Sequence, residues 1–512
     1  MYLLLLAALL LLPGAAAAAG LDELIDQAVS PLSEALSSVI FYNLNLGFGE
    51  VPFIVVWLVT AATFFTVYFG FINLRAFRHS LRLIRGDYTD PDAAGEVTHF
   101  QALATALSGT VGLGNIAGVA IAVSVGGPGA TFWMILAGLL GMSSKFTECT
   151  LGVKYRNEYP DGSISGGPMY YLSKGIAEQY PRLKFLGKLL AVIFAVFCIG
   201  GTLGAGAMFQ TNQAFSQLLQ VTGGETSPLA GYGWAFGALI AVLVGLVIIG
   251  GIRSIARVTE KIVPIMGALY VSVGLVIIFT NLGEVPTAFM AIINGAFNPE
   301  GVAGGAIGVM ILGFRRAAFS NEAGVGSAAI AHSAVRTNEP VTEGLVALYE
   351  PFIDTVVICT ITALVIIITG SLDPSGSMEG VALTSRAYAS VFEWFPYLLF
   401  VAVIMFAFST TISWSYYGVK SWTYLFGEGK GKETFFKLVV MASVVLGASV
   451  NLRAVMDIAD GMILAMALPN LIGVYLLTPV VKRELKSYWG RYKRGELLVY
   501  RDGVGTPERE LR

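Results

Sequence analysis

The chain has 512 residues, of which 55% are hydrophobic and only 13% charged, and its formal net charge is −2. A mean hydropathy of +0.72 and apolar runs along nearly the whole length exclude an ordinary soluble protein and indicate an integral membrane protein. The sequence has no Walker A loop, H-E-x-x-H or G-x-S-x-G motif, so we expect no enzyme, and an ion gradient must drive any uphill transport.

Residues 1–20, MYLLLLAALLLLPGAAAAAG, combine an apolar core with an Ala-x-Ala end and predict a cleaved signal peptide. The alternative is a retained, short anchor helix. Residues 21–52 are acidic up to Glu50, without Lys or Arg, and predict an external amphipathic lead-in.

Apolar windows of about 20 residues predict eleven transmembrane helices. They lie near 53–74, 99–124, 130–153, 185–220, 233–250, 256–280, 303–335, 342–370, 394–426, 434–450 and 457–480. The transporter domain is therefore 53–480, followed by a cytoplasmic tail at 481–512. With the N-terminus outside, 27 of the 32 Lys and Arg residues fall in inner segments, as the positive-inside rule requires.

Two predicted spans contain closely spaced glycines, in GTVGLGNIAGVA at 109–120 and in FSNEAGVGSAAIA at 319–331. They are the first and sixth of the ten spans that follow 53–74, which divides these into core repeats at 99–280 and 303–480. Because five is odd, the second repeat must enter the membrane with opposite polarity, as in transporters with inverted repeats. The alternative for a single motif is close helix packing through Gly114 and Gly118.

A helix break within the bilayer leaves N–H groups on one side and carbonyl groups on the other without helical partners. The N–H groups suit a carboxylate, and the carbonyls suit an ammonium group or a metal cation. Glycine lets a substrate approach the backbone itself. The breaks therefore predict a site for a zwitterion and its coupling cation.

Several motifs then resemble one family in their order along the chain, namely GTVGLGNIAGVA, GGPGATFWM, GGPMYYL at 166–172, FSNEAGVGSA and STTISWSYYG at 409–418. From about 53 to 480 the sequence is similar to the alanine or glycine:cation symporter family. The resemblance implies an all-α fold like that of the bacterial leucine transporter, a 5+5 inverted repeat with one leading helix. It also implies sodium-coupled uptake of alanine, glycine or a similar amino acid across the bacterial inner membrane.

By this resemblance, backbone N–H groups of Gly112, Leu113 and Gly114 receive the substrate carboxylate, and carbonyls near Thr110, Phe319 and Ser320 take the amine. The remaining substrate-site candidates are Asn115, Gln210, Gly324 and Trp414. Trp414 and Phe319 would form walls that leave room for little beyond a methyl group, unless Trp414 faces lipid or a neighbouring helix.

The resemblance also places sodium between the first broken helix and a later span. Its ligands would be the carbonyls of Ser108 and Val111 and hydroxyls among Ser409, Thr410 and Thr411, since a hard cation prefers oxygen. The alternative is that these hydroxyls bond back to their own helices. Asn115 has two interpretations, a second cation site or a cap of the inner half-helix.

Charged residues within spans are functional candidates. We expect Arg315 and Arg316 to pair with Asp457 or Asp460 as an outer gate, with snorkelling to the interface as the alternative. Glu322 should pair with an arginine or cap a half-helix rather than relay protons. Lys145 and Glu148 should form a local ion pair.

The remaining reactive residues carry no recognisable motif. Cys149, Cys198 and Cys359 are predicted to be packing residues. His79 and His99 flank a span, and His332 stands alone in the sequence.

The sequence thus predicts a sodium:alanine or glycine symporter working by alternating access. The alternative is proton coupling through Glu322, and a channel is a further class. The expected partners are a small amino acid, Na⁺ and membrane lipid, without nucleic acid or an organic cofactor.

Overall fold

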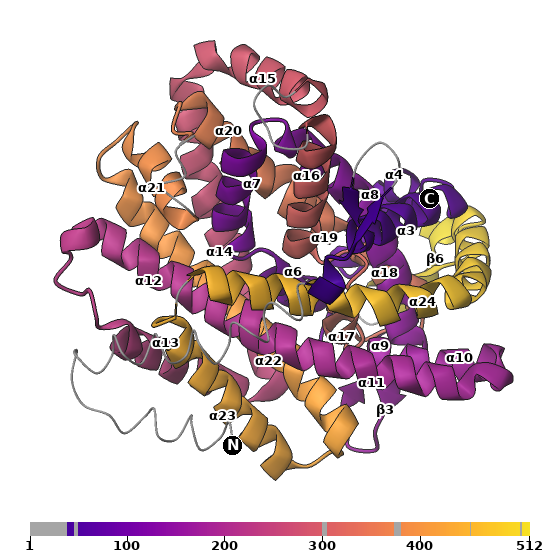
Figure 1. The fold of residues 1–512 in the computed structure, drawn as a ribbon. Helices are drawn as coiled ribbons and strands as arrows, with labels where there is room; N and C mark the ends of the chain where they lie inside the picture. The colour runs from indigo at the N-terminus through magenta and orange to yellow at the C-terminus, as the bar shows by residue number, and fades with distance from the viewer. Residues whose placement is uncertain are drawn as a thin grey trace.

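The computed structural model describes residues 38–45, 50–298, 305–372, 380–450, 452–501 and 504–511. The predicted signal peptide and most of the lead-in lie outside these residues. The fold is almost entirely helical (Figure 1), and its three short β-hairpins lie outside the long helices. Short turns of 3-10 or π-helix are labelled η.

Elements up to the middle of the chain are β1 (Asn43–Asn45), β2 (Glu50–Pro52), α3 (Phe53–Tyr68), α4 (Ile72–Arg75), α5 (Phe77–Ile84), α6 (His99–Thr110), η1 (Gly114–Gly118), α7 (Val119–Gly126), α8 (Ala130–Lys154), β3 (Asn157–Glu158), β4 (Ile164–Ser165), α9 (Pro168–Tyr170), η2 (Tyr171–Gly175), α10 (Ile176–Gln179), η3 (Pro181–Leu183), α11 (Lys184–Gly201), η4 (Thr202–Met208), α12 (Phe209–Val221), η5 (Gly224–Thr226), α13 (Gly233–Ile248) and α14 (Gly251–Thr280).

The second half of the chain contains η6 (Leu282–Glu284), α15 (Val285–Phe297), α16 (Gly305–Asn321), α17 (Ala328–His332), α18 (Pro340–Val346), α19 (Tyr349–Pro351), η7 (Phe352–Cys359), α20 (Thr360–Ile368), α21 (Val381–Ala389), α22 (Phe395–Phe426), α23 (Lys430–Gly447), α24 (Leu452–Lys493), β5 (Leu498–Arg501), β6 (Val504–Pro507) and α25 (Glu508–Leu511).

Every predicted apolar window contains one or more of these helices. Within the described residues, five helical stretches are long and apolar enough to cross a membrane, at Pro181–Val221, Gly251–Thr280, Pro340–Ile368, Phe395–Phe426 and Val455–Lys493. A sixth candidate is the bent pair His99–Thr110 and Gly114–Gly126. The structure therefore supports a multi-pass membrane protein, while the count of eleven spans stays a prediction.

Helix α6 begins where the sequence supplies a capping box. The Thr98 hydroxyl accepts a hydrogen bond from the Gln101 backbone N–H at 3.2 Å, and the Gln101 side chain accepts one from the Thr98 N–H at 3.1 Å. These bonds satisfy donors that a helix start leaves free. The cap fixes the start of the helix whose other end forms the first break.

Two long helices hold the interrupted helices together. Helix α8 packs against α3, α16, α17 and α18, and α22 packs against α6, α11, α12 and α14. Helix α16 contacts both η1 and α7, the segments that follow the first break. The two breaks consequently lie side by side in the buried core.

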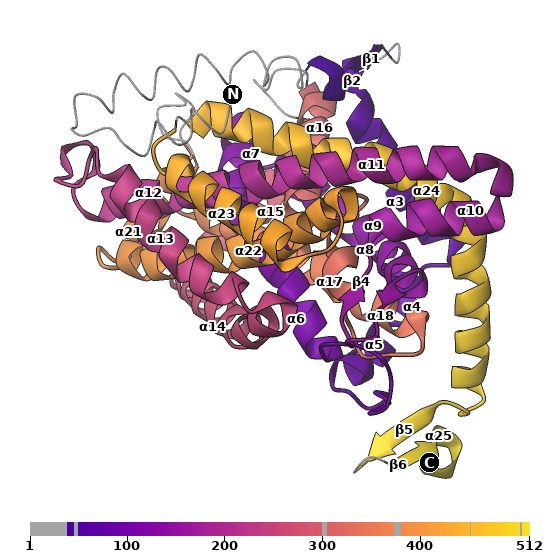
Figure 2. The same cartoon turned by 90° about the horizontal axis from the view of Figure 1, so that it is seen from below.

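The end of the chain docks onto the segment that follows the first span. Figure 2 shows α24 extending past the bundle to the β5–β6 hairpin. There Glu508 accepts a 2.8 Å hydrogen bond from Arg82, and the Tyr500 N–H donates to the Asp87 carbonyl at 2.9 Å. The tail is therefore packed against residues predicted to be cytoplasmic.

Candidate functional site between two broken helices

The first break begins directly after Thr110. Val111 has φ −75° and ψ 87°, which no α-helix adopts, and the chain resumes as a π-helical turn at Gly114–Gly118. The two halves of the helix differ in direction by 50°. All residues from Thr110 to Gly118 are buried. The predicted interruption of this helix is confirmed.

Side-chain amides occupy the N–H groups that the first break exposes. The Gly112 N–H donates to Asn115 Oδ1 at 2.9 Å, and the Leu113 N–H donates to Gln210 Oε1 at 3.1 Å. Gln210 comes from α12, so the structure brings this predicted residue to the break. The amide oxygen of Asn115 therefore caps the break itself. Its amide nitrogen donates to Asp354, which is described below.

Gly112 is required by close packing. A Cβ atom added at this position would lie 2.5 Å from the Thr410 hydroxyl oxygen of α22, far inside van der Waals contact. Gly114 approaches the second break instead, because a Cβ there would lie 3.4 Å from the ring of Phe319 and 3.7 Å from the Cα of Ser320. The two breaks thus touch through their predicted substrate residues.

The second break follows Asn321, the last residue of α16. Glu322 has φ 55°, and Gly324 and Gly326 have φ 90° and 93°, values that glycine adopts readily and other residues rarely. The carbonyl of Gly324 accepts a 2.9 Å bond from the side chain of Asn470 in α24. The helix resumes as α17 after Ser327. This second predicted interruption is also confirmed.

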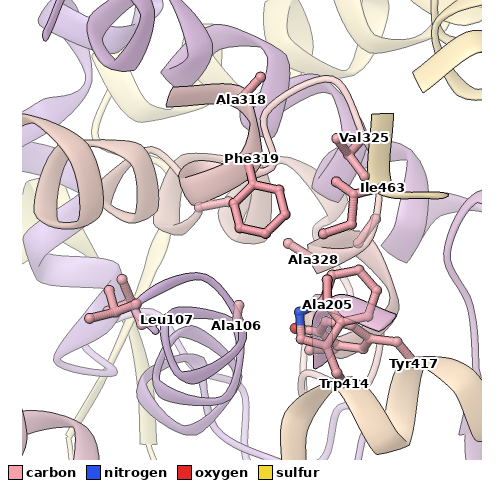
Figure 3. Close-up of a cluster of buried hydrophobic side chains, with 14 of the residues drawn as sticks. Ala106, Leu107, Ala205, Ala318, Phe319, Val325, Ala328, Trp414, Tyr417 and Ile463 are labelled. Atoms are coloured by element: carbon pink, nitrogen blue, oxygen red, sulfur yellow. The ribbon is translucent and has the colours of Figure 1, made fainter. Parts of the chain in front are cut away.

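Phe319 and Trp414 both point into the interior beside the breaks (Figure 3). Trp414 is 1% exposed, and its Nε1 donates to the Gly109 carbonyl at 3.3 Å and to Glu322 Oε1 at 3.1 Å. Trp414 therefore faces both broken helices and not lipid. Small side chains, among them Ala106, Ala205 and Ala328, surround the two aromatic rings.

The predicted sodium ligands meet between α6 and α22. Thr410 Oγ1 donates to the Ser108 carbonyl at 2.9 Å, and Ser108 Oγ donates to the Ser409 carbonyl at 2.6 Å. Val111, the fifth candidate, is buried at the end of α6. Thr411 instead bonds back to Ala407 of its own helix at 2.8 Å. The oxygen cluster therefore includes Ser108, the Ser409 carbonyl and Thr410. The Ser409 hydroxyl, like that of Thr411, bonds back within α22, to the Phe406 carbonyl at 3.1 Å.

Asp354 is a buried carboxylate at both breaks that the sequence analysis misses. It accepts hydrogen bonds from Asn115 Nδ2 at 2.6 Å, from Ser320 Oγ at 2.8 Å and from Thr355 Oγ1 at 2.7 Å. A carboxylate inside an apolar span was a usable signal. Its contact with Asn115 and Ser320 could not be read from sequence because η7 brings it from a distant position.

The proposed outer gate residues also meet. Arg315 and Arg316 of α16 both pair with Asp460 of α24, Arg315 at 2.8 Å, while Asp457 is half-buried and is not the residue that they contact. Asp460 is 1% exposed. The Arg315 guanidinium also stacks on the ring of Phe41, 3.9 Å from its centroid. The alternative of free snorkelling is therefore disfavoured for Arg316, which is buried.

Two expectations about ionisable residues are wrong, those for the partner of Lys145 and for an isolated His332. Lys145 pairs with Glu350 at 3.2 Å and not with Glu148, whose carboxylate accepts a bond from Asn470 at 2.7 Å. Within the part of the chain that the structure describes, Glu322 bonds to Ser327 and Trp414 rather than to an arginine. Lys145 thus has a tertiary partner in place of the local one that sequence spacing suggested. Glu322 contacts Ser327 directly before α17, so a capping role at that half-helix stays a prediction.

The second error concerns His332, which does not stand alone. Its two ring nitrogens face Glu343 and Glu350, each at 2.5 Å. The three cysteines are free and buried, in keeping with packing roles.

The chain is similar to known proteins over most of its length. The model of the sodium:alanine symporter family matches residues 34–501. The chain is 39% identical over 440 residues to the sodium/alanine symporter AgcS of Methanococcus maripaludis, covering 85% of this chain and 94% of that protein. It is 33% identical over 452 residues to the probable sodium/glutamine symporter GlnT of Bacillus subtilis, covering 87% and 90% respectively.

A solved structure shows the same fold. The crystal structure of MhsT in complex with L-phenylalanine aligns with a TM-score of 0.50 at 14% identity, covering 76% of this chain and 99% of that chain. The fold and the paired helix breaks define a membrane transporter of the leucine-transporter type, as predicted. The chain belongs to the sodium:alanine symporter family, whose members are cation-coupled amino acid symporters and not enzymes.

Proposed function

We propose that this protein imports alanine, glycine or a similarly small amino acid together with sodium by alternating access around the two breaks. The observation that carries the proposal is the direct contact of the breaks, where Gly114 meets Phe319 and Ser320. Backbone groups of both broken helices can therefore reach one small zwitterion at once.

The substrate carboxylate accepts hydrogen bonds from the N–H groups of Gly112 and Leu113. Without substrate, these N–H groups donate to the side chains of Asn115 and Gln210. An anion is a stronger acceptor than an amide oxygen, so the exchange is favourable. The substrate amine is bound by carbonyls near Thr110, Phe319 and Ser320. Phe319 and Trp414 then limit the side chain to roughly the size of a methyl group.

Sodium binds at the oxygen cluster of Ser108, Ser409 and Thr410, next to Gly112. The contact between Thr410 and the first break gives a physical link, because an ion there fixes the backbone that receives the carboxylate. Orientation follows the distribution of Lys and Arg, with the N-terminus outside and the C-terminus in the cytoplasm.

Uptake of labelled alanine into proteoliposomes tests the proposal. The rate should depend on an inward sodium gradient, should be smaller with lithium, and should persist without a proton gradient. Exchange of internal for external alanine distinguishes a carrier from a channel. Uptake that ignores sodium but follows a proton gradient would replace sodium coupling with proton coupling and contradict the proposal.

A further inference from the structure

Five buried ionisable side chains form a connected network on the predicted inner side of the breaks. They are His99 of α6, Lys145 of α8, His332 of α17, Glu343 of α18 and Glu350 of α19. None is more than 1% exposed. Helices α6 and α17 are the predicted inner halves of the two broken helices, so the network connects both of them to α8.

Glu343 bridges the two inner half-helices with its two carboxylate oxygens. Oε2 contacts His99 Nδ1, and Oε1 contacts His332 Nδ1 at 2.5 Å. His332 Nε2 faces Glu350 Oε1 at 2.5 Å, and the other oxygen of Glu350 lies 3.2 Å from Lys145 Nζ.

The hydrogen-bond geometry fixes the number of protons in this network. A neutral imidazole has one N–H group and one lone pair. If His332 were neutral, its lone pair would face a carboxylate oxygen at hydrogen-bond distance, which is repulsive. While both carboxylates are ionised, both contacts become favourable only when the imidazole carries a proton on each nitrogen. Imidazole is the more basic group, so it rather than a carboxylate holds this proton.

Charge balance within these five side chains agrees with one such proton. With a protonated His332, the two positive charges of His332 and Lys145 balance the two negative charges of Glu343 and Glu350. A neutral Nδ1–H tautomer of His99 completes the set without adding charge. Buried charges are tolerated when they are paired, whereas an uncompensated charge in this interior is costly.

We propose that His332 is a proton-binding site whose resident proton ties the inner halves of both broken helices to α8. The ligand is a single proton, held between Glu343 and Glu350. Its functional consequence rests on the proposed transport, because a site that joins α6 to α17 sets the ease with which the inner side opens. The proton itself does not depend on that function.

Other ionisable groups face the network from neighbouring elements. Cys149 lies near His332 and Glu350, with the ligand atoms of the three within 4.8 Å of one another. Glu148 and Glu322 also interact electrostatically with Lys145. The Glu148 carboxylate accepts a hydrogen bond from Asn470, and the Glu322 carboxylate accepts from Ser327 and Trp414. The Lys145 ammonium on Glu350 disfavours a metal ion at Cys149, so a proton is the better ligand.

The direct test is ¹⁵N NMR of the histidine-labelled wild-type protein, whose sequence has three histidines. At about pH 8, where a solvated imidazole is neutral, we expect one imidazolium signal with both nitrogens protonated. This signal should remain in His79→Gln and disappear in His332→Gln. Finding only neutral imidazole signals in the wild-type protein would overturn the proposal.

Two variants test the consequence for transport with opposite signs. Lys145→Met removes a positive charge, so the network needs an extra proton to stay neutral. The pH profile of the uptake rate should therefore shift toward lower pH. Glu350→Gln removes a negative charge, so the network becomes neutral by losing the His332 proton. The pH profile of the uptake rate should therefore shift toward higher pH. The double variant restores neutrality and should recover the wild-type profile. Glu148 and Glu322 are the same in all these proteins and cannot produce the difference.

The expected effect is a change of about tenfold, in opposite directions, in the ratio of uptake rates at about pH 6 and pH 8.5. The melting temperature of each purified variant should follow the same pH trends, which keeps the test valid for a variant that does not transport. If the pH profiles of Lys145→Met and Glu350→Gln shifted in the same direction, or did not shift, the proposal would be overturned. Absence of sodium-driven uptake in the wild-type protein would instead count against the proposed function and leave the NMR result to decide the proton site.

Discussion

Within the first break, Gly112 is the glycine at which one added methyl group should have the largest effect. In Gly112→Ala the methyl would lie 2.5 Å from Thr410 Oγ1, whereas at Gly118 a Cβ meets nothing within 4 Å. Overpacking a tight site costs about 1–3 kcal/mol, so Gly112→Ala should reduce alanine uptake by about tenfold or more. Gly118→Ala, the matched control in the same break, should stay near wild type. Equal losses in both variants would show that general helix packing, not the close approach at Gly112, explains the glycines.

His79 gives a prediction for pH at the predicted cytoplasmic face. Burial, followed by the positive charge of Arg82, lowers the pKa of His79 to about 4 from its usual 6.5. Between these values the unfolded chain binds a proton that the folded protein does not, so stability is lost as pH falls through this window. The full effect is about 3 kcal/mol.

The melting temperature of the purified protein should therefore fall on acidification from about pH 6.5, and His79→Gln should reduce that fall. Other acidic groups titrate in the same range, so the difference between the two proteins is the quantity to compare. A parallel fall in both would show that His79 does not contribute.

At the level of elements, the contact between α6 and α22 separates two adjacent threonines. Thr410 bonds across to Ser108, whereas Thr411 bonds back within α22. Thr410→Ala should raise the sodium concentration for half-maximal uptake by about tenfold, since a lost oxygen ligand or charged hydrogen bond is worth 1.5–3 kcal/mol. Thr411→Ala should leave sodium dependence nearly unchanged. A larger effect at Thr411 would move the cation away from this contact.

Helices α16 and α24 are joined by the shared carboxylate of Asp460. Asp460→Asn leaves the buried Arg316 without its counter-charge, and removing one partner of a buried pair costs about 3–5 kcal/mol. We expect a marked drop in melting temperature and in uptake. Arg315→Gln should be milder, because the Arg315 side chain is 27% exposed and Arg316 still pairs with Asp460. The reverse order of severity would contradict the arrangement of this gate.

The sequence predicted elements better than contacts between them. Both breaks were predictable because glycine is unusual inside an apolar span, and the structure interrupts the helices at Val111 and Glu322. Asp354 and the His332 network were not predictable, since their partners converge from separate helices. Lys145 shows the limit most clearly, because spacing favours Glu148 whereas packing of α8 against α19 supplies Glu350.

At the scale of the whole molecule, the breaks lie in one buried core held by α8 and α22. Gate residues Arg315 and Asp460 contact each other on the predicted outer side, and the His332 network connects the inner half-helices. The proposed substrate and cation sites therefore lie in the middle of the structure, between two sets of ionic contacts. This arrangement is what alternating access requires, because either set can open while the other stays closed.

The most direct measurement is binding of labelled alanine to the purified protein with and without sodium, in the wild type, Gly112→Ala and Gly118→Ala. We predict that sodium strengthens alanine binding to the wild type and to Gly118→Ala, and that Gly112→Ala binds little alanine in either condition. Alanine binding that is indifferent to sodium, or that survives unchanged in Gly112→Ala, would contradict a shared substrate and cation site at the two helix breaks.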